Sequence, residues 1–125
     1  MSVHYLHTKL RVSDLDRAIA FYEAAFGYVL RKRKPGPHAS LLAFLSLPGE
    51  ETELQLAFYP DQGPFEVPPY LMHLALRVDR LQSVIECALK AGATLISGPY
   101  TLPSGSEVAF MRDPDGYELE LIQKP

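Results

Sequence analysis

Four polar side chains stand out because their types suit a metal ion and their positions are paired. They are His7, Gln55, His73 and Glu120. Two imidazoles, an amide oxygen and a carboxylate form a suitable shell for one divalent cation, since imidazole binds Zn, Ni, Fe or Co and oxygen ligands tolerate an open octahedral geometry. A single histidine on a strand is more often a hydrogen-bonded core or surface residue than a ligand. Two histidines at equivalent positions, each matched with a polar residue inside an aliphatic strand, favour metal binding and predict a small metalloenzyme.

The equivalence comes from an internal duplication. The matching segments are 6–12 (LHTKLRV) with 72–78 (MHLALRV), 43–44 with 109–110 (both AF), and 53–56 (ELQL) with 118–121 (ELEL). The first match pairs His7 with His73. The last match pairs Gln55 with Glu120, so one member of that pair is a neutral amide and the other is a carboxylate.

Each half of the duplication predicts a strand, a helix and three further strands. In the first half we expect strands near 3–12, 28–34, 41–47 and 53–59, with a helix that Ser13 or Asp14 caps and Gly27 ends. In the second half we expect strands near 71–78, 94–96, 107–111 and 117–122, with a helix over about 80–91 that Gly92 ends. The predicted fold class is α+β. Two tandem βαβββ modules, about 1–60 and 70–125, are joined by a proline-rich linker, about 61–69, in a single domain 1–125.

Alternation along the strands predicts which side chains face a polar cleft. Leu6, Leu10 and Val12 would share the aliphatic face of the first strand, which the following helix would cover, whereas His7 and Arg11 would point to the other side. The same alternation turns the ligand candidate in the last strand of each half away from its leucine neighbours. The opposite faces of the two sheets should curve toward each other and leave the cleft.

Composition limits the classes of function. The chain has 125 residues, of which 47% are hydrophobic and 22% are charged, and this is ordinary for one globular domain. The net charge of −3 and the lack of an extended basic stripe argue against nucleic-acid binding. No signal-like or membrane-spanning segment is apparent, so we expect no membrane association and a cytoplasmic location.

Other polar residues allow two interpretations. Arg11 and Arg77 are repeat mates that could steer an anionic substrate to the cleft, or could form salt bridges across the sheet. His4 and His38 fit structural or solvent-exposed roles. The single cysteine, Cys87, lies at core-like spacing in the second helix and is interpreted as a small buried apolar residue.

Three segments closely resemble the vicinal oxygen chelate superfamily, and within it the glyoxalase I (lactoylglutathione lyase) enzymes of the short bacterial type. They are 6–22 (LHTKLRVSDLDRAIAFY), 73–79 (HLALRVD) and 113–122 (DPDGYELELI). By that resemblance His7, His73 and Glu120 match three metal ligands, and Gln55 falls where the family usually has a glutamate. The implied cofactor is one divalent ion per site, nickel or zinc first, with cobalt, manganese or iron as alternatives.

The resemblance also implies a reaction and an assembly. The reaction is isomerisation of the methylglyoxal–glutathione hemithioacetal to S-lactoylglutathione, with Glu120 as the general base. Arg11 matches an arginine that contacts glutathione. Tyr59 stands where the family usually has an asparagine that contacts glutathione, and we take it as a second substrate-binding residue. Each site would lie at a homodimer interface, with His7 and Gln55 from one chain and the other two ligands from its partner.

Three other functions remain open at this point. The same superfamily contains Fe(II) extradiol dioxygenases, whose facial triad is also built from two histidines and one carboxylate, and thiol transferases that inactivate fosfomycin. A metal-free module that binds a small ligand in the same cleft is the third alternative.

Overall fold

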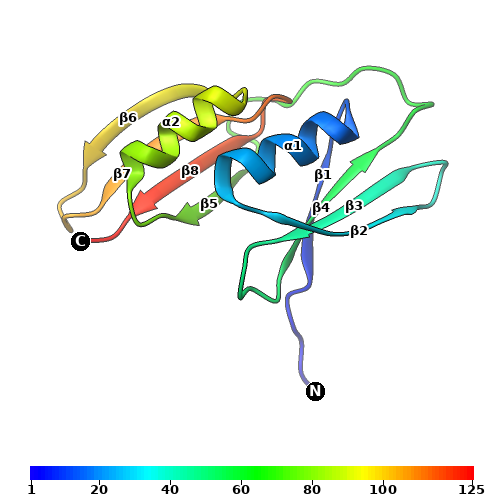
Figure 1. The fold of residues 1–125 in the computed structure, drawn as a ribbon, viewed down its shortest axis with the longest axis horizontal. Coiled ribbons are helices and arrows are strands. Elements are labelled where there is room, and N and C mark those ends of the chain that lie inside the picture. The colour runs from blue at the N-terminus through cyan, green and yellow to red at the C-terminus, as the bar shows by residue number, and fades with distance from the viewer. The chain divides into compact units, whose positions relative to one another are not determined.

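The computed structural model describes residues 1–125, with two helices and eight strands in two four-stranded sheets (Figure 1). The chain divides into two compact units. Module one comprises Met1–Glu23 and Gly27–Phe65, and module two comprises Ala24–Phe26 and Glu66–Pro125. The α+β class and the order of one strand, one helix and three strands in each half are confirmed. None of the helices has the length and apolarity needed to span a membrane.

Sheet one has the strand order β1-β4-β3-β2. The elements of the first half are β1 (His7–Arg11), α1 (Leu15–Phe26), β2 (Val29–Pro35), β3 (Leu41–Ser46) and β4 (Glu53–Phe58). The first and last strands, β1 and β4, are parallel neighbours, and the other pairs are antiparallel. The register places Lys9 opposite Gln55 and Gln55 opposite Phe44, so these three residues form one row across the sheet.

Sheet two repeats this topology with the strand order β5-β8-β7-β6. The elements of the second half are β5 (His73–Arg77), α2 (Leu81–Ala91), β6 (Thr94–Thr101), β7 (Glu107–Arg112) and β8 (Glu118–Gln123). Again the first and last strands are parallel neighbours. The row equivalent to that of sheet one consists of Ala75, Glu120 and Phe110.

Aliphatic side chains fill one face of each sheet. In sheet one Leu10, Leu45 and Leu56 are fully buried, and in sheet two Leu119 and Leu121 are fully buried. Helix α2 packs against β6, β7 and β8, and it buries the side chains Leu81, Ile85 and Ala88. Burying apolar surface supplies most of the favourable free energy of folding, so these faces fix the direction in which the remaining side chains point.

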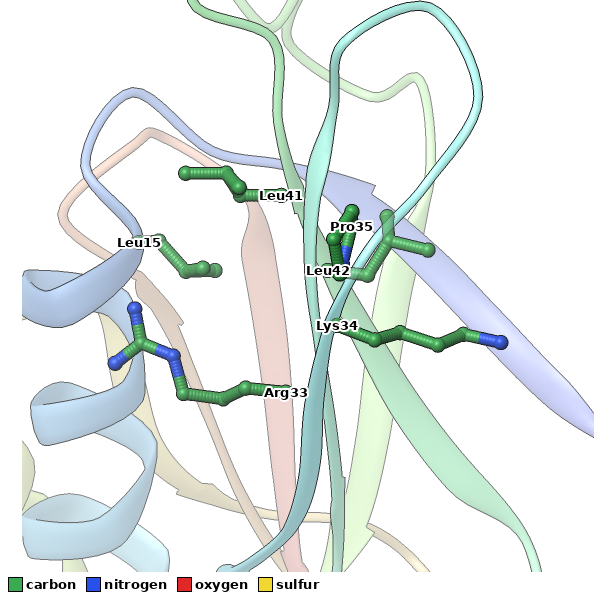
Figure 2. Close-up of a pocket in the computed structure, with 6 residues that line it drawn as sticks. All are labelled: Leu15, Arg33, Lys34, Pro35, Leu41 and Leu42. Atoms are coloured by element: carbon green, nitrogen blue, oxygen red, sulfur yellow. The ribbon is translucent and has the colours of Figure 1, made fainter.

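Neighbouring side chains of strand β2 point to opposite faces of sheet one (Figure 2). Arg33 points toward α1, where its Nη1 lies 2.7 Å from Asp16 Oδ1. Lys34 extends to the opposite side. Its Nζ lies 5.6 Å from the centroid of the Phe44 ring. The face that holds Phe44 is therefore the face away from α1, and we call it the polar face.

The two helices end alike but begin differently. Gly27 and Gly92 follow the helices with φ of 78° and 119°, as the glycine signals predict. At the start of α1 the Asp14 carboxylate accepts a hydrogen bond from Arg17 N at 3.0 Å. Helix α2 has no such cap from Arg80. Instead the amide of Leu81 donates to the Gln123 side chain of β8 at 2.7 Å, so a distant strand satisfies this helix terminus.

Three local expectations are wrong. Leu6 is 68% exposed because β1 begins only at His7, after Leu6. Strand β6 does not end near residue 96 but continues through Pro99, which lies at an irregularity in the pairing with β7 between Ser97 and Tyr100, in an edge strand. Cys87 is exposed, since it lies beside the buried stripe of α2 and not on it.

Candidate metal centre and its surroundings

In module two the histidine and the glutamate come together. His73 is the first residue of β5 and Glu120 lies in the middle of the neighbouring β8. The His73 Nε2 atom is 3.4 Å from Glu120 Oε1, and the two side chains are 45% and 22% exposed. A ring nitrogen and a carboxylate oxygen at this separation on an accessible face can share one cation or one proton.

In module one the equivalent positions lie on the polar face of sheet one. His7 begins β1, and Gln55 lies on β4 one strand away, displaced by two residues in the register. The Gln55 side chain is buried, with 8% exposed. An amide in this place offers a neutral oxygen to a cation but cannot accept a proton as a carboxylate does.

Each candidate imidazole stands against a phenyl ring. His7 lies edge-on to Phe44, with ring centroids 5.9 Å apart, and His73 lies in the same way against Phe110, at 6.1 Å. Such contacts restrict rotation of the imidazole and shield one side of it from water. Sequence reasoning assigned no role to these phenylalanines, although the duplicated Ala-Phe pair was the signal that could have identified them.

Each module therefore supplies one imidazole and one oxygen donor from its first and last strands. No group of three or more His, Cys, Asp or Glu side chains gathers as a metal site in this chain. The donor chemistry suits a borderline divalent ion, because two imidazoles, one amide and one carboxylate combine nitrogen and oxygen ligands with a single negative charge.

Arg11 and Tyr59 lie together in module one. They line a pocket of about 410 Å³ with His38 and Gln62. The Arg11 guanidinium donates to the carbonyl oxygen of Gly63 at 2.8 Å and lies 5.9 Å from the centroid of the Tyr59 ring.

Arg11 also stacks on a second aromatic ring, since its Cζ lies 4.5 Å from the centroid of Phe65. The guanidinium is thus held in a fixed position at the pocket, as a residue that orients an anionic substrate should be. Its repeat mate Arg77 is exposed. The two arginines therefore differ in their surroundings, although the duplication makes them equivalent.

Lys9 is the side chain that sequence reasoning did not select. Its ammonium donates a hydrogen bond to the Tyr59 hydroxyl at 2.7 Å. In the strand register Lys9 lies opposite Gln55. The equivalent residue in module two is Ala75. A lysine at one repeat position and an alanine at the other was the available signal.

Comparison with known proteins extends over nearly the whole chain. The sequence pattern described as the Glyoxalase/Bleomycin resistance protein/Dioxygenase superfamily matches residues 4–121. The lactoylglutathione lyase of Neisseria meningitidis is 34% identical over 124 residues, which cover 95% of this chain and 89% of that protein.

Two solved structures are similar in sequence and in fold. The trypanothione-dependent glyoxalase I of Leishmania major superposes with a TM-score of 0.81 at 31% identity, covering 98% of this chain and 88% of that one. Glyoxalase I of Zea mays superposes with a TM-score of 0.83 at 30% identity over 96% of this chain. This chain spans only 44% of the maize chain.

Proposed function

Since the chain belongs to the glyoxalase/bleomycin resistance protein/dioxygenase superfamily, we propose that it is a glyoxalase I-like metalloenzyme. It isomerises the hemithioacetal of methylglyoxal and a thiol to the corresponding lactoyl thioester. The observation that carries this proposal is the pair of His73 Nε2 and Glu120 Oε1 at 3.4 Å, in a chain whose relatives over nearly its full length are lactoylglutathione lyases.

The metal ligands in this proposal are His7, Gln55, His73 and Glu120. Their nitrogen and oxygen donors fit nickel or zinc, and also cobalt, manganese or iron. When bound, the ion supplies charge stabilisation for the two neighbouring oxygens of the substrate. In the assembly that we propose, a homodimer, His7 and Gln55 come from one protomer and the other two ligands come from its partner.

Glu120 acts as the general base in this scheme. It takes the proton from one substrate carbon and returns it to the neighbouring carbon, so no net proton is gained or lost in the isomerisation. Gln55 cannot share this work, because an amide oxygen is not basic enough to accept the proton. The carboxylate of Glu120 alone therefore carries the proton between the two carbons.

Arg11 and Tyr59 bind the thiol part of the substrate. The guanidinium of Arg11, held by Gly63 and Phe65, pairs with a carboxylate of the thiol. Glutathione is the thiol that we propose first. A relative that depends on trypanothione indicates that the thiol differs among these enzymes, so other thiols belong in the test. We place the enzyme in the cytoplasm, where such thiols are kept reduced.

The proposal is tested with purified protein loaded with nickel, or with zinc. Elemental analysis should find one ion per site, and ultraviolet absorbance should report thioester formation from methylglyoxal and glutathione. Glutathione is then replaced by other low-molecular-weight thiols. Retention of neither metal, or absence of thioester with every thiol in the presence of bound metal, would contradict the proposal.

A further inference from the structure

We propose that module one carries a second binding site for an anion, beside Gln55, and that this site selects 2-oxoaldehydes whose side chain ends in a carboxylate or phosphate. The inference rests on the proposed function for its place next to the reacting carbons. The site is a pocket of about 320 Å³. It is lined by Lys9, Pro37, His38, Ser40, Leu42, Gln55 and Tyr59.

Several side chains of the lining carry hydrogen-bond donors. The Lys9 ammonium donates one of its three hydrogens to the Tyr59 hydroxyl at 2.7 Å, so two hydrogens can be donated to a ligand. Because Tyr59 accepts that bond, its own hydrogen can point elsewhere in the pocket. The oxygens of an anion would find a cation and several donors here, beside the apolar side chains of Pro37 and Leu42.

Ser40 lies in the wall of this pocket. Its side chain is 1% exposed, and its Oγ has no hydrogen-bond partner. The hydroxyl is held in place by a close approach to Gly36, where an added Cβ would lie only 2.5 Å from the Oγ. The hydroxyl is therefore closed off from the pocket, and the site rests on the other polar side chains of the lining.

The loop between β2 and β3 brings His38 to the same pocket. His38 and Ala39 both have positive φ, 59° and 58°, a conformation that non-glycine residues adopt rarely. Hydrogen bonds from Gly36 N to Ser40 O and from Ser40 N to Pro37 O close this turn. His38 also lines the pocket of Arg11, so the two pockets adjoin at His38 and Tyr59.

The position of the pocket decides which part of the substrate it would bind. Lys9 lies directly opposite Gln55 in the register of β1 and β4. If Gln55 is a ligand of the catalytic ion, a group bound by Lys9 lies next to the carbons that react. Arg11 lies in the adjoining pocket and would bind the thiol. Module two has Ala75 in the place of Lys9, so this cationic site belongs to module one alone.

The experiment compares two substrates of equal length on the metal-loaded enzyme with glutathione. One is a 2-oxoaldehyde that ends in a carboxylate, and the other is its uncharged methyl ester. We expect kcat/KM to favour the carboxylate by about tenfold or more, the value of one hydrogen bond to a charged group. Lys9→Met should abolish this preference.

Lys32→Met is the matched control, because Lys32 also lies over the Phe44 ring but does not line the pocket. It removes the same charge and should change the preference by less than about threefold. Ser40→Ala is a second variant. It should leave the preference unchanged, because the Ser40 hydroxyl is closed off from the pocket.

A binding measurement separates failure of this inference from failure of the proposed function. Calorimetric titration with succinate, and with inorganic phosphate, should give a signal that Lys9→Met loses and Lys32→Met retains. This outcome would support the site even if no thioester formed. Equal turnover of carboxylate and ester, or equal anion binding by wild type and Lys9→Met, would overturn the inference.

Discussion

The two modules share a plan, and they differ most in the row that crosses each sheet beside the imidazole. Module one has Lys9, Gln55 and Phe44 in this row, and module two has Ala75, Glu120 and Phe110. The phenyl ring and the imidazole against it are the same in both. The charge is reversed, because one row carries a cation and no carboxylate, and the other carries a carboxylate and no cation.

The difference indicates how the two copies of a duplicated site can take on different roles. Features that orient the imidazoles are kept in both copies, whereas the residues that handle protons and charge have diverged. In the proposed enzyme, module two carries the base and module one carries the groups that bind the anionic parts of the substrate.

Removing the base should have the largest effect. Glu120→Gln gives both modules a glutamine at the ligand position, and kcat/KM should fall by about 10²–10⁴-fold, the usual contribution of general base catalysis. The rate is measured by thioester absorbance at saturating metal, with the metal content verified by elemental analysis. Activity close to that of wild type would show that Glu120 is not the base.

Moving the general base from module two to module one should require changes at both Gln55 and Lys9. In the double variant Gln55→Glu, Glu120→Gln the new carboxylate faces Lys9 and should pair with it, so little activity returns. Adding Lys9→Ala copies the row of module two into module one. We expect this triple variant to recover part of the lost activity. Full recovery in the double variant would mean that Lys9 has no influence on its neighbour.

The histidines should remain equivalent where the oxygens are not. His7→Ala and His73→Ala should each weaken metal binding by more than the roughly 10–100-fold typical of an outer-shell substitution. Equilibrium titration with zinc or nickel measures this loss. An affinity that falls in one variant only would indicate that the duplication preserves the residue type but not the ligand role.

The first strands differ in burial, which predicts unequal stability. Leu10 in β1 is fully buried, and its repeat mate Leu76 in β5 is only partly buried. Leu10→Ala should lower the free energy of unfolding by about 2–5 kcal/mol. Leu76→Ala should cost clearly less, because less apolar surface is lost. Urea denaturation of both variants gives the two values, and equal losses would remove this contrast.

The helix starts should give the smallest effects. Asp14→Ala removes the local cap of α1 and should cost about 0.5–2 kcal/mol. Gln123→Ala removes the hydrogen bond that satisfies Leu81 N in α2 and should cost about 0.5–1.5 kcal/mol. Thermal denaturation detects both. Gln123→Glu serves as a control for the second variant, since it keeps an acceptor oxygen.

Local signals made much of this fold predictable. The start of α1 follows from a capping aspartate, and the ends of both helices follow from glycines in a left-handed conformation. All of these signals act over a few neighbouring residues. The duplication placed the ligand candidates on first and last strands. Strand β6 was predicted too short because Gly98-Pro99 normally ends a strand, whereas in this edge strand the pairing with β7 resumes at Tyr100 beyond an irregularity.

Contacts across strands were not predictable in the same way. The row of Lys9, Gln55 and Phe44 depends on a register between segments far apart in the sequence. The bond between Lys9 and Tyr59 depends on that register as well. The exposure of Cys87 had a different cause. Its spacing in α2 suggested a core position, but the buried side of the helix is formed by Leu81, Ile85 and Ala88.

The parallel pairing of first and last strands has a kinetic consequence. In each module the two ligand candidates occupy strands separated by the rest of the module, so they meet only when the non-local pairing is complete. An ion held by such residues would bind the native state but not the transition state for folding. Metal binding should therefore slow unfolding and leave the folding rate almost unchanged. The metal would stabilise the native state after folding and would not help to nucleate folding.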